Sequence, residues 1–455
     1  MMRGYRLSQL ASAAGVRHHG ADAEVRGVAI DSRSVMPGDL FVALPGSRVD
    51  GHTFLADAAA RGAAAALVSR VQDIPLPQLV VDDVLTALGQ LAACNRRRFS
   101  GQLIAVTGSC GKTSVKGMLS TVLARRARVL ATAGNFNNEI GVPLTLLRLS
   151  PDDGIAVVEM GARGTGHIDY LCRLATPDIA LLLNASAAHL EGFGSLQAVA
   201  DAKGEIYDRL APDGVAIVNA DSPFARAWTD RARTTGARVI SYGLQALASV
   251  SASAIELGPD HCRFALQHAG HSAQVVLPVP GEHSVSNALA TAAAAIACGM
   301  SVADIAEGLG EVQPTQGRLQ RRQGRGGISL IDDAYNANPA SVRAAIDVLG
   351  RCSGPRVLVL GAMLELGEQS ADAHAEVGRY AREQGIETLV GVGAAPQAAT
   401  EAFGAGASWF ACNEEAIAAA GQWSAGAATV LVKGSRGAAM EQVLAALQPE
   451  EMQSC

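Results

Sequence analysis

The sequence Leu103-Ile-Ala-Val-Thr-Gly-Ser-Cys-Gly-Lys-Thr-Ser-Val115 combines an apolar segment, a turn bounded by two glycines and the start of a helix. Residues 103–106 are continuously apolar, as expected for a buried parallel strand. After Lys112, apolar residues recur at helical spacing, at Val115, Met118, Leu119, Val122 and Leu123. The pattern predicts a strand–turn–helix unit with residues 108–111 at the N-terminus of the helix.

This turn has the features of a phosphate-binding loop. Backbone N–H groups and the helix dipole favour an anion there, Lys112 can reach the β- and γ-phosphates, and Thr113 can ligate Mg²⁺. The loop is the short Gly-x-x-Gly-Lys-Thr form, because Val106 stands where the general motif has its first glycine. An ordinary strand–helix turn is the alternative, but the flanking elements favour nucleotide binding. The predicted phosphate-binding residues are Gly108, Ser109, Cys110, Gly111, Lys112, Thr113 and Ser114.

Composition narrows the class of protein. The 455 residues are 49% hydrophobic and 18% charged, which suits two to four domains with large cores and disfavours disorder. The net charge of −6 gives no support for a nucleic-acid or anionic-membrane partner. We expect no membrane span and no signal peptide, and the eight scattered cysteines, without a C-x-x-C pair, favour reduced thiols and a cytoplasmic location.

Alternating strand and helix patterns predict an α/β protein of three domains. Their expected bounds are 1–99, 100–314 and 315–455. The expected strands of the central, mostly parallel sheet are 103–106, 155–158, 179–183, 215–218 and 238–240, with an antiparallel insert at 262–279. The expected strands of the last, Rossmann-like domain are 328–331, 356–360, 388–390 and 429–432.

Polar residues follow several of these strands. Glu159 ends a strand where an open α/β sheet exposes its ligand crevice, which suits a Mg²⁺-organising acid. The amide-rich stretch Asn135–Pro143 can orient phosphate, metal-bound water or a carboxyl group, or it can simply cap the next helix. His189 follows the next strand and is either a structural hydrogen-bonding group or a metal ligand.

Lys203 lies on the same helix face as Leu196, Val199, Ala200 and Ile206. A lysine on an apolar face must extend its amine to solvent, pair with a carboxylate or lose its charge. The sequence alone leaves these three alternatives open.

Further polar clusters lie in the outer domains. Arg318 suits a phosphate, and the stretches 332–339 and 433–436 follow two strands of the last domain, which together indicate a binding face. In the first domain, Asp31-Ser32-Arg33 could hold a polar ligand or form a capped turn with a surface ion pair.

The whole pattern resembles the Mur ligase family. Matching stretches run almost from end to end in the same order, including Asp50-Gly-His52, residues 107–114, Glu159-Met-Gly-Ala162, Lys203-Gly-Glu205, Tyr335-Asn-Ala-Asn338 and Lys433-Gly-Ser-Arg436.

The resemblance implies a role for each matching residue. Lys112 and Thr113 would hold the ATP phosphates and Mg²⁺, and Glu159 with Asn137 or Asn138 would complete the first metal site. His189 would join a second Mg²⁺, supported by Lys203, which matches the lysine that the family carbamylates with CO₂. The remaining roles are Asn287 for adenine, Arg318 for the phosphates, Asp333 for the ribose, Asn336 and Asn338 for an acceptor dipeptide, and Asp31, Ser32 and Arg33 for a uridine nucleotide.

The activity implied is ATP-dependent formation of an amide bond between UDP-N-acetylmuramoyl-tripeptide and D-Ala-D-Ala by a cytoplasmic monomer. Alternatives are a Mur ligase that adds another amino acid, or a ligase like folylpolyglutamate synthase. In that synthase, however, the P-loop lies near the start of the chain, whereas about a hundred residues precede it here. A nucleotide-switched binding protein could keep the P-loop, but it would have no use for Glu159, His189 and Lys203 together.

Overall fold

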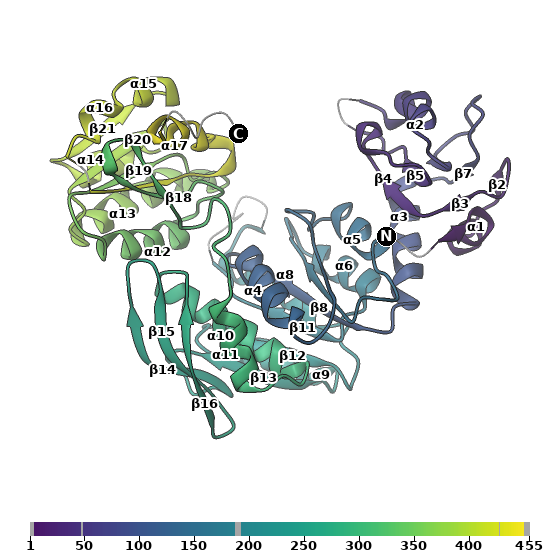
Figure 1. Cartoon of the computed structure of the whole chain (residues 1–455), viewed down its shortest axis with the longest axis horizontal. Helices are drawn as coiled ribbons and strands as arrows, with labels where there is room; N and C mark the ends of the chain where they lie inside the picture. Colours follow the sequence, from purple (N-terminus) through teal and green to yellow (C-terminus); the bar gives the residue numbers. More distant parts are fainter. Residues whose placement is uncertain (1–3, 47–48, 187–192, 427, 450–455) are drawn as a thin grey trace.

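The computed structural model describes residues 4–46, 49–186, 193–426 and 428–449. It confirms an α/β chain of three domains, with the first and last domains at opposite ends of the long axis and the central domain between them (Figure 1). Among the described residues, no helix is long and apolar enough to cross a membrane.

The described part of the first domain forms a five-stranded sheet in the order β2-β7-β6-β5-β4. These strands are β2 (His18–His19), β4 (Gly27–Ala29), β5 (Asp39–Val42), β6 (Ala65–Val68) and β7 (Gln78–Val80). A separate pair joins β1 (Tyr5–Arg6) and β3 (Glu24–Val25). The helices are α1 (Leu7–Ala14), α2 (Leu55–Ala60) and α3 (Val84–Arg97), and α3 packs against helices of the central domain.

Within the described residues, the central domain has a nine-stranded sheet in the order β16-β15-β14-β13-β12-β11-β8-β10-β9. The strands are β8 (Gln102–Thr107), β9 (Val129–Ala131), β10 (Ile155–Glu159), β11 (Ile179–Leu182), β12 (Val215–Asn219), β13 (Arg238–Gly243), β14 (Val250–Leu257), β15 (Cys262–His268) and β16 (His271–Leu277). Pairing is parallel from β9 to β14 and antiparallel from β14 to β16, which confirms the expected insert. Short β9 and the mostly half-buried β14 were not predicted.

Alternate residues of β8 face two separate hydrophobic clusters. Leu103 and Ala105 pack in one cluster, whereas Ile104 and Val106 pack in the other. The helices that cover the sheet are α4 (Lys112–Ala124), α5 (Gly141–Leu147), α6 (His167–Ala175), α8 (Leu196–Gly204), α9 (Ala225–Thr234), α10 (Glu282–Ala297) and α11 (Val302–Gly310). The cluster around Leu103 continues without a break to Leu40 and Leu79 of the first domain, so these two domains share one core.

The described part of the last domain forms a six-stranded sheet in the order β17-β18-β22-β19-β20-β21, with its own hydrophobic clusters. The strands are β17 (Gln320–Gln323), β18 (Ser329–Asp333), β19 (Arg356–Leu360), β20 (Thr388–Val392), β21 (Ala407–Phe410) and β22 (Thr429–Lys433). The helices are α12 (Pro339–Gly350), α13 (Ser370–Glu383), α14 (Gln397–Phe403), α15 (Asn413–Ala418), α16 (Ala420–Trp423) and α17 (Glu441–Leu447). All four predicted strands are present, and the unpredicted β17 and β21 lie at the two edges.

Short 3₁₀ helices interrupt the connections. They are η1 (Ser32–Ser34), η2 (Gly51–Phe54), η3 (Glu205–Tyr207), η4 (Arg325–Gly327), η5 (Gly367–Gln369) and η6 (Arg436–Ala438).

Candidate active site

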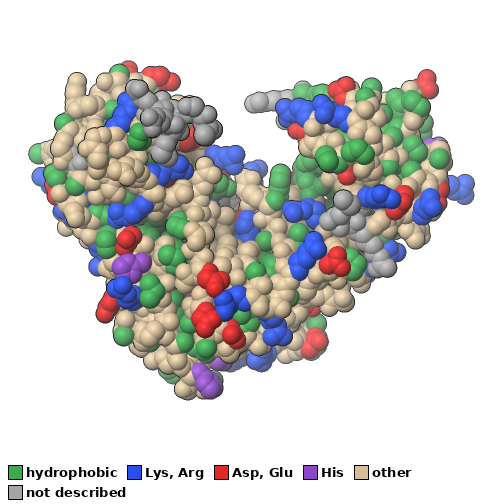
Figure 2. All heavy atoms as spheres, viewed as in Figure 1, with side chains coloured by type: hydrophobic (Ala, Val, Ile, Leu, Met, Phe, Trp, Pro, Cys, Tyr) green, Lys and Arg blue, Asp and Glu red, His purple; other side chains and the backbone are tan. Residues whose placement is uncertain are grey.

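A cavity of 1620 Å³ is lined by residues of the central and last domains, with Ile30 of the first domain also in its wall. Figure 2 shows the molecule hollowed between its two outer domains. Because the carboxyl ends of the parallel strands β8, β10 and β18 all contribute to the wall, the predicted polar residues at those ends meet in one space.

The predicted P-loop lies at the N-terminus of α4. Gly111 has a positive φ of 84°, and a Cβ atom there would lie only 2.7 Å from Asn287 Oδ1, so both the conformation and the space require glycine. Lys112 Nζ donates to the Gly108 carbonyl at 2.6 Å, and burial lowers the pKa of Lys112. The loop backbone therefore surrounds the Lys112 ammonium group, which was predicted to contact phosphate.

Asn184, which the sequence did not single out, holds this loop from the segment that follows β11. Its main-chain carbonyl accepts from the Ser109 N–H at 3.0 Å, and its Oδ1 accepts from the Cys110 N–H at 2.9 Å. Two of the donors expected to face phosphate are thus used within the protein. The N–H groups of the first turn of α4 have no partner inside a helix and are the ones left for an anion.

Glu159 is almost completely buried at the end of β10. Its carboxylate accepts from Asn137 Nδ2 at 2.8 Å and from the Thr113 hydroxyl at 3.3 Å, and it forms an ion pair with Lys116 Nζ at 3.2 Å. Asn138 instead caps α5, where its Oδ1 accepts from the Gly141 N–H at 2.9 Å. Of the two asparagines left open by the sequence, Asn137 is therefore the one that contacts Glu159.

Lys116 is a site residue that the sequence analysis missed. It is buried on α4 one helical turn after Lys112, and it also donates to the Gly134 carbonyl at 2.7 Å. Its neighbours one helical turn away are Lys112, Thr113 and Ser120 as well as Leu119, so the sequence pattern did not mark it as buried.

The donors around Glu159 fit Mg²⁺. A carboxylate, a hydroxyl and an amide carbonyl are hard oxygen ligands, and Mg²⁺ is usually held by one or two carboxylates together with substrate phosphates. The described residues contain no cluster of three His, Cys, Asp or Glu that could hold a metal ion. His189, expected near a second ion, lies outside the described residues.

Lys203 is 2% exposed and lines the cavity. Its amine does not extend to solvent, and within the described part of the chain it has no hydrogen-bond or ion-pair partner. Burial, aided by the nearby charge of Lys112, lowers the pKa of Lys203 to about 7. Loss of charge is the alternative that this environment favours. Leu196, which was expected on the same buried face, is 40% exposed.

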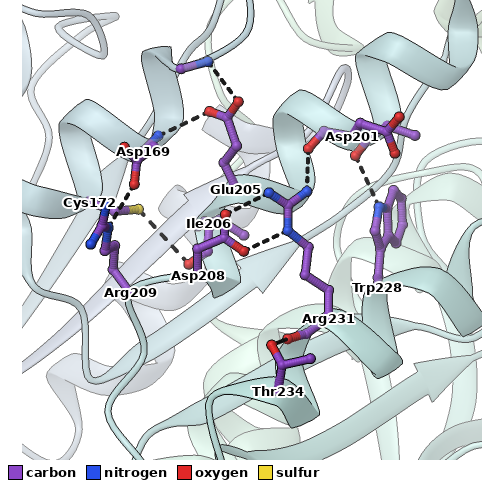
Figure 3. A network of polar contacts seen from close by, with 12 residues as sticks. Asp169, Cys172, Asp201, Glu205, Ile206, Asp208, Arg209, Trp228, Arg231 and Thr234 are labelled. Carbon is purple, nitrogen blue, oxygen red and sulfur yellow. Dashed lines mark hydrogen bonds and ion pairs between the residues drawn. The ribbon is translucent and has the colours of Figure 1, made fainter.

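Glu205, in η3 directly after α8, fixes the helix end that carries Lys203 (Figure 3). Its two carboxylate oxygens accept from the backbone N–H groups of Gly166 at 2.6 Å and Asp169 at 3.1 Å. These N–H groups lie at the start of α6, where the helix dipole favours a negative charge. The contact joins the Lys203 helix to the segment that follows Glu159.

Residues of α9 fasten α8 from the other side (Figure 3). Trp228 Nε1 donates to the Ala200 carbonyl at 3.1 Å, and Arg231 Nη1 donates to the Asp201 carbonyl at 2.6 Å. Arg231 also forms a two-pronged ion pair with Asp208, with both distances at 2.6 Å. The last turn of α8 is thereby held between α6 and α9.

Arg318 reaches from the last domain to the P-loop. Its Nη2 donates to the Thr113 hydroxyl at 3.2 Å, and its guanidinium carbon lies 4.4 Å from the centre of the Tyr335 ring. The buried Nε atom has no hydrogen-bond partner among the described residues. This arrangement leaves a donor for an anion beside the P-loop.

Asp333 pairs with Lys433 Nζ at 2.5 Å at the ends of neighbouring strands. Burial raises the pKa of Asp333, and the Lys433 charge opposes this shift. Lys433 also donates to the Asn336 carbonyl at 3.0 Å, while the Asn336 side chain is exposed. Asn338 caps α12 by accepting from the Ser341 N–H at 2.9 Å. Both predicted dipeptide residues line the cavity, and the Asn336 side chain has no hydrogen-bond partner among the residues that the structure describes.

The first-domain candidates form a capped turn with a surface ion pair. Asp31 caps η1 and pairs with Arg33 at 2.7 Å, which lowers the pKa of Asp31 to about 2. Ser32 is buried beneath this turn. Among the described residues of this turn, Ile30 lines the cavity and Asp31, Ser32 and Arg33 do not.

A nucleotide-type phosphate loop on one domain faces a polar binding surface on another across one cavity, which is the arrangement of an ATP-dependent enzyme that joins two substrates. The chain belongs to the Mur ligase family. It matches the Mur ligase family catalytic domain at residues 24–96, the Mur ligase middle domain at 106–295 and the Mur ligase glutamate ligase domain at 317–436.

Named relatives extend over nearly the whole chain. The UDP-N-acetylmuramoyl-tripeptide–D-alanyl-D-alanine ligase of Escherichia coli K12 is 44% identical over 446 residues, covering 97% of this chain and 98% of that protein. A crystal structure of MurF from Acinetobacter baumannii superposes with a TM-score of 0.92 at 38% identity, covering 98% of both chains. MurF from Thermotoga maritima in complex with ADP gives a TM-score of 0.81 at 27% identity, covering 92% and 96%.

Proposed function

We propose that the chain joins D-Ala-D-Ala to UDP-N-acetylmuramoyl-tripeptide with consumption of ATP, as a step of peptidoglycan precursor synthesis. The observation that carries this proposal is the single cavity in which Lys112, Glu159 and Lys203 of the central domain face Arg318 and Asn336 of the last domain. The 44% identity to a ligase of that name over nearly the full chain supports the choice of substrates.

The reaction needs an activated acyl group, because a peptide carboxylate is a poor acyl donor. A carboxylate oxygen of the tripeptide attacks the γ-phosphorus of ATP, the bond to ADP breaks, and an acyl phosphate forms. The neutral amine of D-Ala-D-Ala then attacks the acyl carbon, phosphate leaves, and the amine loses a proton. Lys112 and Arg318 neutralise charge on the transferred phosphoryl group, and a closed cavity protects the acyl phosphate from water.

Residues around the P-loop would hold two Mg²⁺ ions. Thr113 and Glu159, with Asn137 or Asn138, would hold the first, and His189 with a carbamylated Lys203 would hold the second. Bound Mg²⁺ supplies positive charge beside the phosphates. Asn137 is the better candidate of the two asparagines, because Asn138 is already used as a helix cap.

The environment of Lys203 supports its carbamylation. An uncharged amine attacks CO₂, a C–N bond forms, and loss of a proton leaves a carbamate anion. The buried site favours the uncharged amine, and a metal would stabilise the resulting negative charge.

The remaining assignments complete the proposal. Asn287 contacts adenine, Arg318 the phosphates and Asp333 the ribose, while Asp31, Ser32 and Arg33 hold the uridine nucleotide. The domain bounds are 1–99, 100–314 and 315–455, and the protein acts as a cytoplasmic monomer.

Phosphate release tests this function. With ATP and Mg²⁺, release should require both D-Ala-D-Ala and a UDP-N-acetylmuramoyl-tripeptide, and omission of either should abolish it. Separate assays with diaminopimelate or lysine as the third residue of the tripeptide would establish the preferred tripeptide substrate. Release that is independent of the dipeptide would contradict the proposal.

A further inference from the structure

Arg436 is a cation of the cavity wall to which the proposed mechanism gives no role. It lies in η6, just after β22, and its side chain is exposed to the cavity. Within the described residues, its guanidinium group has no hydrogen bond and no ion pair. Lys433, three residues earlier, is instead committed to Asp333. Arg436 is therefore available to an anionic group of a ligand.

Leu364 lies beside Gly437, the residue after Arg436, and gives the same wall an apolar surface. Its side chain is 48% exposed, although it lines the cavity. A Cβ atom at Gly437, the residue after Arg436, would lie 2.8 Å from Leu364 Cδ1. The absence of a side chain at Gly437 thus allows Leu364 to lie directly against the Arg436 turn.

Buried polar groups hold this wall in position. The Leu364 N–H donates to the Ser435 hydroxyl at 2.9 Å, and the Ser435 N–H donates to the Ala362 carbonyl at 2.9 Å. Behind the loop, the Met363 N–H donates to Nε2 of the fully buried His374 at 3.0 Å. The backbone that carries Leu364 is therefore held in place before any ligand binds, which reduces the entropic cost of binding.

Ser435 also connects this wall to the predicted dipeptide residues. Its hydroxyl donates to the Ala337 carbonyl at 3.1 Å, and Ala337 lies between Asn336 and Asn338. One connected surface thus contains the turn at Arg436 and Gly437, the loop at residues 362–364 and the exposed Asn336 amide.

We propose that Arg436 and Leu364 bind the acceptor dipeptide at the end opposite its reacting amine: the Arg436 guanidinium pairs with the terminal carboxylate, and Leu364 packs against a methyl group. This inference rests on the proposed function. The amine must stay uncharged and free to attack, so affinity must come from the carboxylate, the peptide amide and the two methyl groups. A guanidinium beside an apolar side chain matches the carboxylate and the methyl group of one D-alanine residue.

The test compares D-Ala-D-Ala with D-alanyl-D-alaninamide, in which the terminal carboxylate is replaced by an uncharged amide. In the unaltered enzyme, the KM of the amide should exceed that of the acid by at least about ten-fold, as expected for loss of a charge-assisted pair. In Arg436→Gln the ratio should fall close to one, and in Arg436→Lys it should lie between the two. The KM for ATP should change less than two-fold in both variants.

Arg351→Gln is the matched control. Arg351 also lines the cavity but follows the far end of the twelve-residue α12, about 18 Å along the helix from Asn338. This variant should retain the acid-to-amide ratio of the unaltered enzyme. Leu364→Ala should lower the preference for D-Ala-D-Ala over glycine-containing dipeptides by roughly four-fold, the value of one buried methyl group.

Two results separate the possible failures. If Arg436→Gln keeps the full acid-to-amide ratio while it still forms product, Arg436 does not contact the carboxylate and the inference is overturned. If the unaltered enzyme releases no phosphate in response to D-Ala-D-Ala, the proposed function fails first. Calorimetric binding of the dipeptide to Arg436→Gln in the presence of ATP analogue and tripeptide nucleotide gives a check independent of turnover, and unweakened binding also overturns the inference.

Discussion

The side-chain amide of Asn338 donates a hydrogen bond to the sulfur of Cys110, with an Nδ2 to Sγ distance of 3.0 Å. Asn338 belongs to the last domain and Cys110 to the P-loop, so the two halves of the proposed site are already in contact. The other side-chain atom of Asn338 caps α12. A shift of α12 would therefore directly change the contact between Asn338 and Cys110 in the P-loop.

We expect Asn338→Ala to raise the KM for D-Ala-D-Ala more than the KM for ATP. It should also lower the free energy of unfolding by about 1 kcal/mol, because α12 loses its N-cap. Asn338→Ser should keep the cap and most of the stability, but not the contact with Cys110. Steady-state kinetics and urea unfolding of both variants separate the two effects, and unchanged KM values would place the dipeptide contacts elsewhere.

Lys112→Ala should lower kcat at saturating ATP by at least ~100-fold, because one preorganised charge contact to the phosphoryl group is lost. The measurement is steady-state phosphate release. Turnover close to that of the unaltered enzyme would remove Lys112 from the phosphate site.

Lys203→Ala should abolish activity by removing an anion that supports a metal. A short carboxylate such as acetate or formate should enter the gap and restore part of the rate. Lys203→Arg should stay inactive with the same additives, because its fixed positive charge cannot become an anion. Activity of the alanine variant without added carboxylate, or free replacement by arginine, would exclude the carbamate.

Lys116→Met should destabilise the protein when Mg²⁺ is absent, because it leaves the buried Glu159 carboxylate without its cation. Breaking a buried pair in this way costs about 3 kcal/mol. Mg²⁺ with ATP should therefore raise the Tm of this variant more than that of the unaltered protein, as measured by differential scanning fluorimetry. An equal rise of the Tm in both proteins would show that Glu159 does not contact Mg²⁺.

Arg33→Gln should raise the pKa of Asp31 from about 2 toward the ordinary value of 3.8. Because the folded-state pKa is depressed, the stabilisation from this carboxylate is fully present above pH 3.8 and is lost as the pH falls through about 2. An NMR titration of the Asp31 carboxyl carbon measures the shift directly. No change between the two proteins would mean that Arg33 is not the cause.

Features that depend on neighbouring residues in the chain were predictable. The strand, turn and helix around Lys112 follow from local apolar spacing and two glycines. The same spacing placed Lys203 on an apolar helix face, but it left open whether its amine is buried. Lys116, on α4, was missed because its carboxylate partner Glu159 lies on β10, a strand that is distant in the sequence. Asn184 was missed because its role is to hold two backbone N–H groups of a loop that is distant in the sequence.

The same limit applies to the choice between Asn137 and Asn138. Both are amides in one loop, and only the folded backbone determines that one contacts Glu159 and the other caps α5.

The hydrophobic core shared by the first and central domains fixes the distance between these two domains. If the first domain holds the uridine end of the substrate, the distance from that end to the P-loop cannot change without disrupting the core. A muramoyl peptide that is one residue too short would leave its carboxylate away from the phosphoryl donor, and a longer one would overshoot. Selection for the length of the peptide stem would then be a property of the scaffold, separate from any contact with the side chains of that stem.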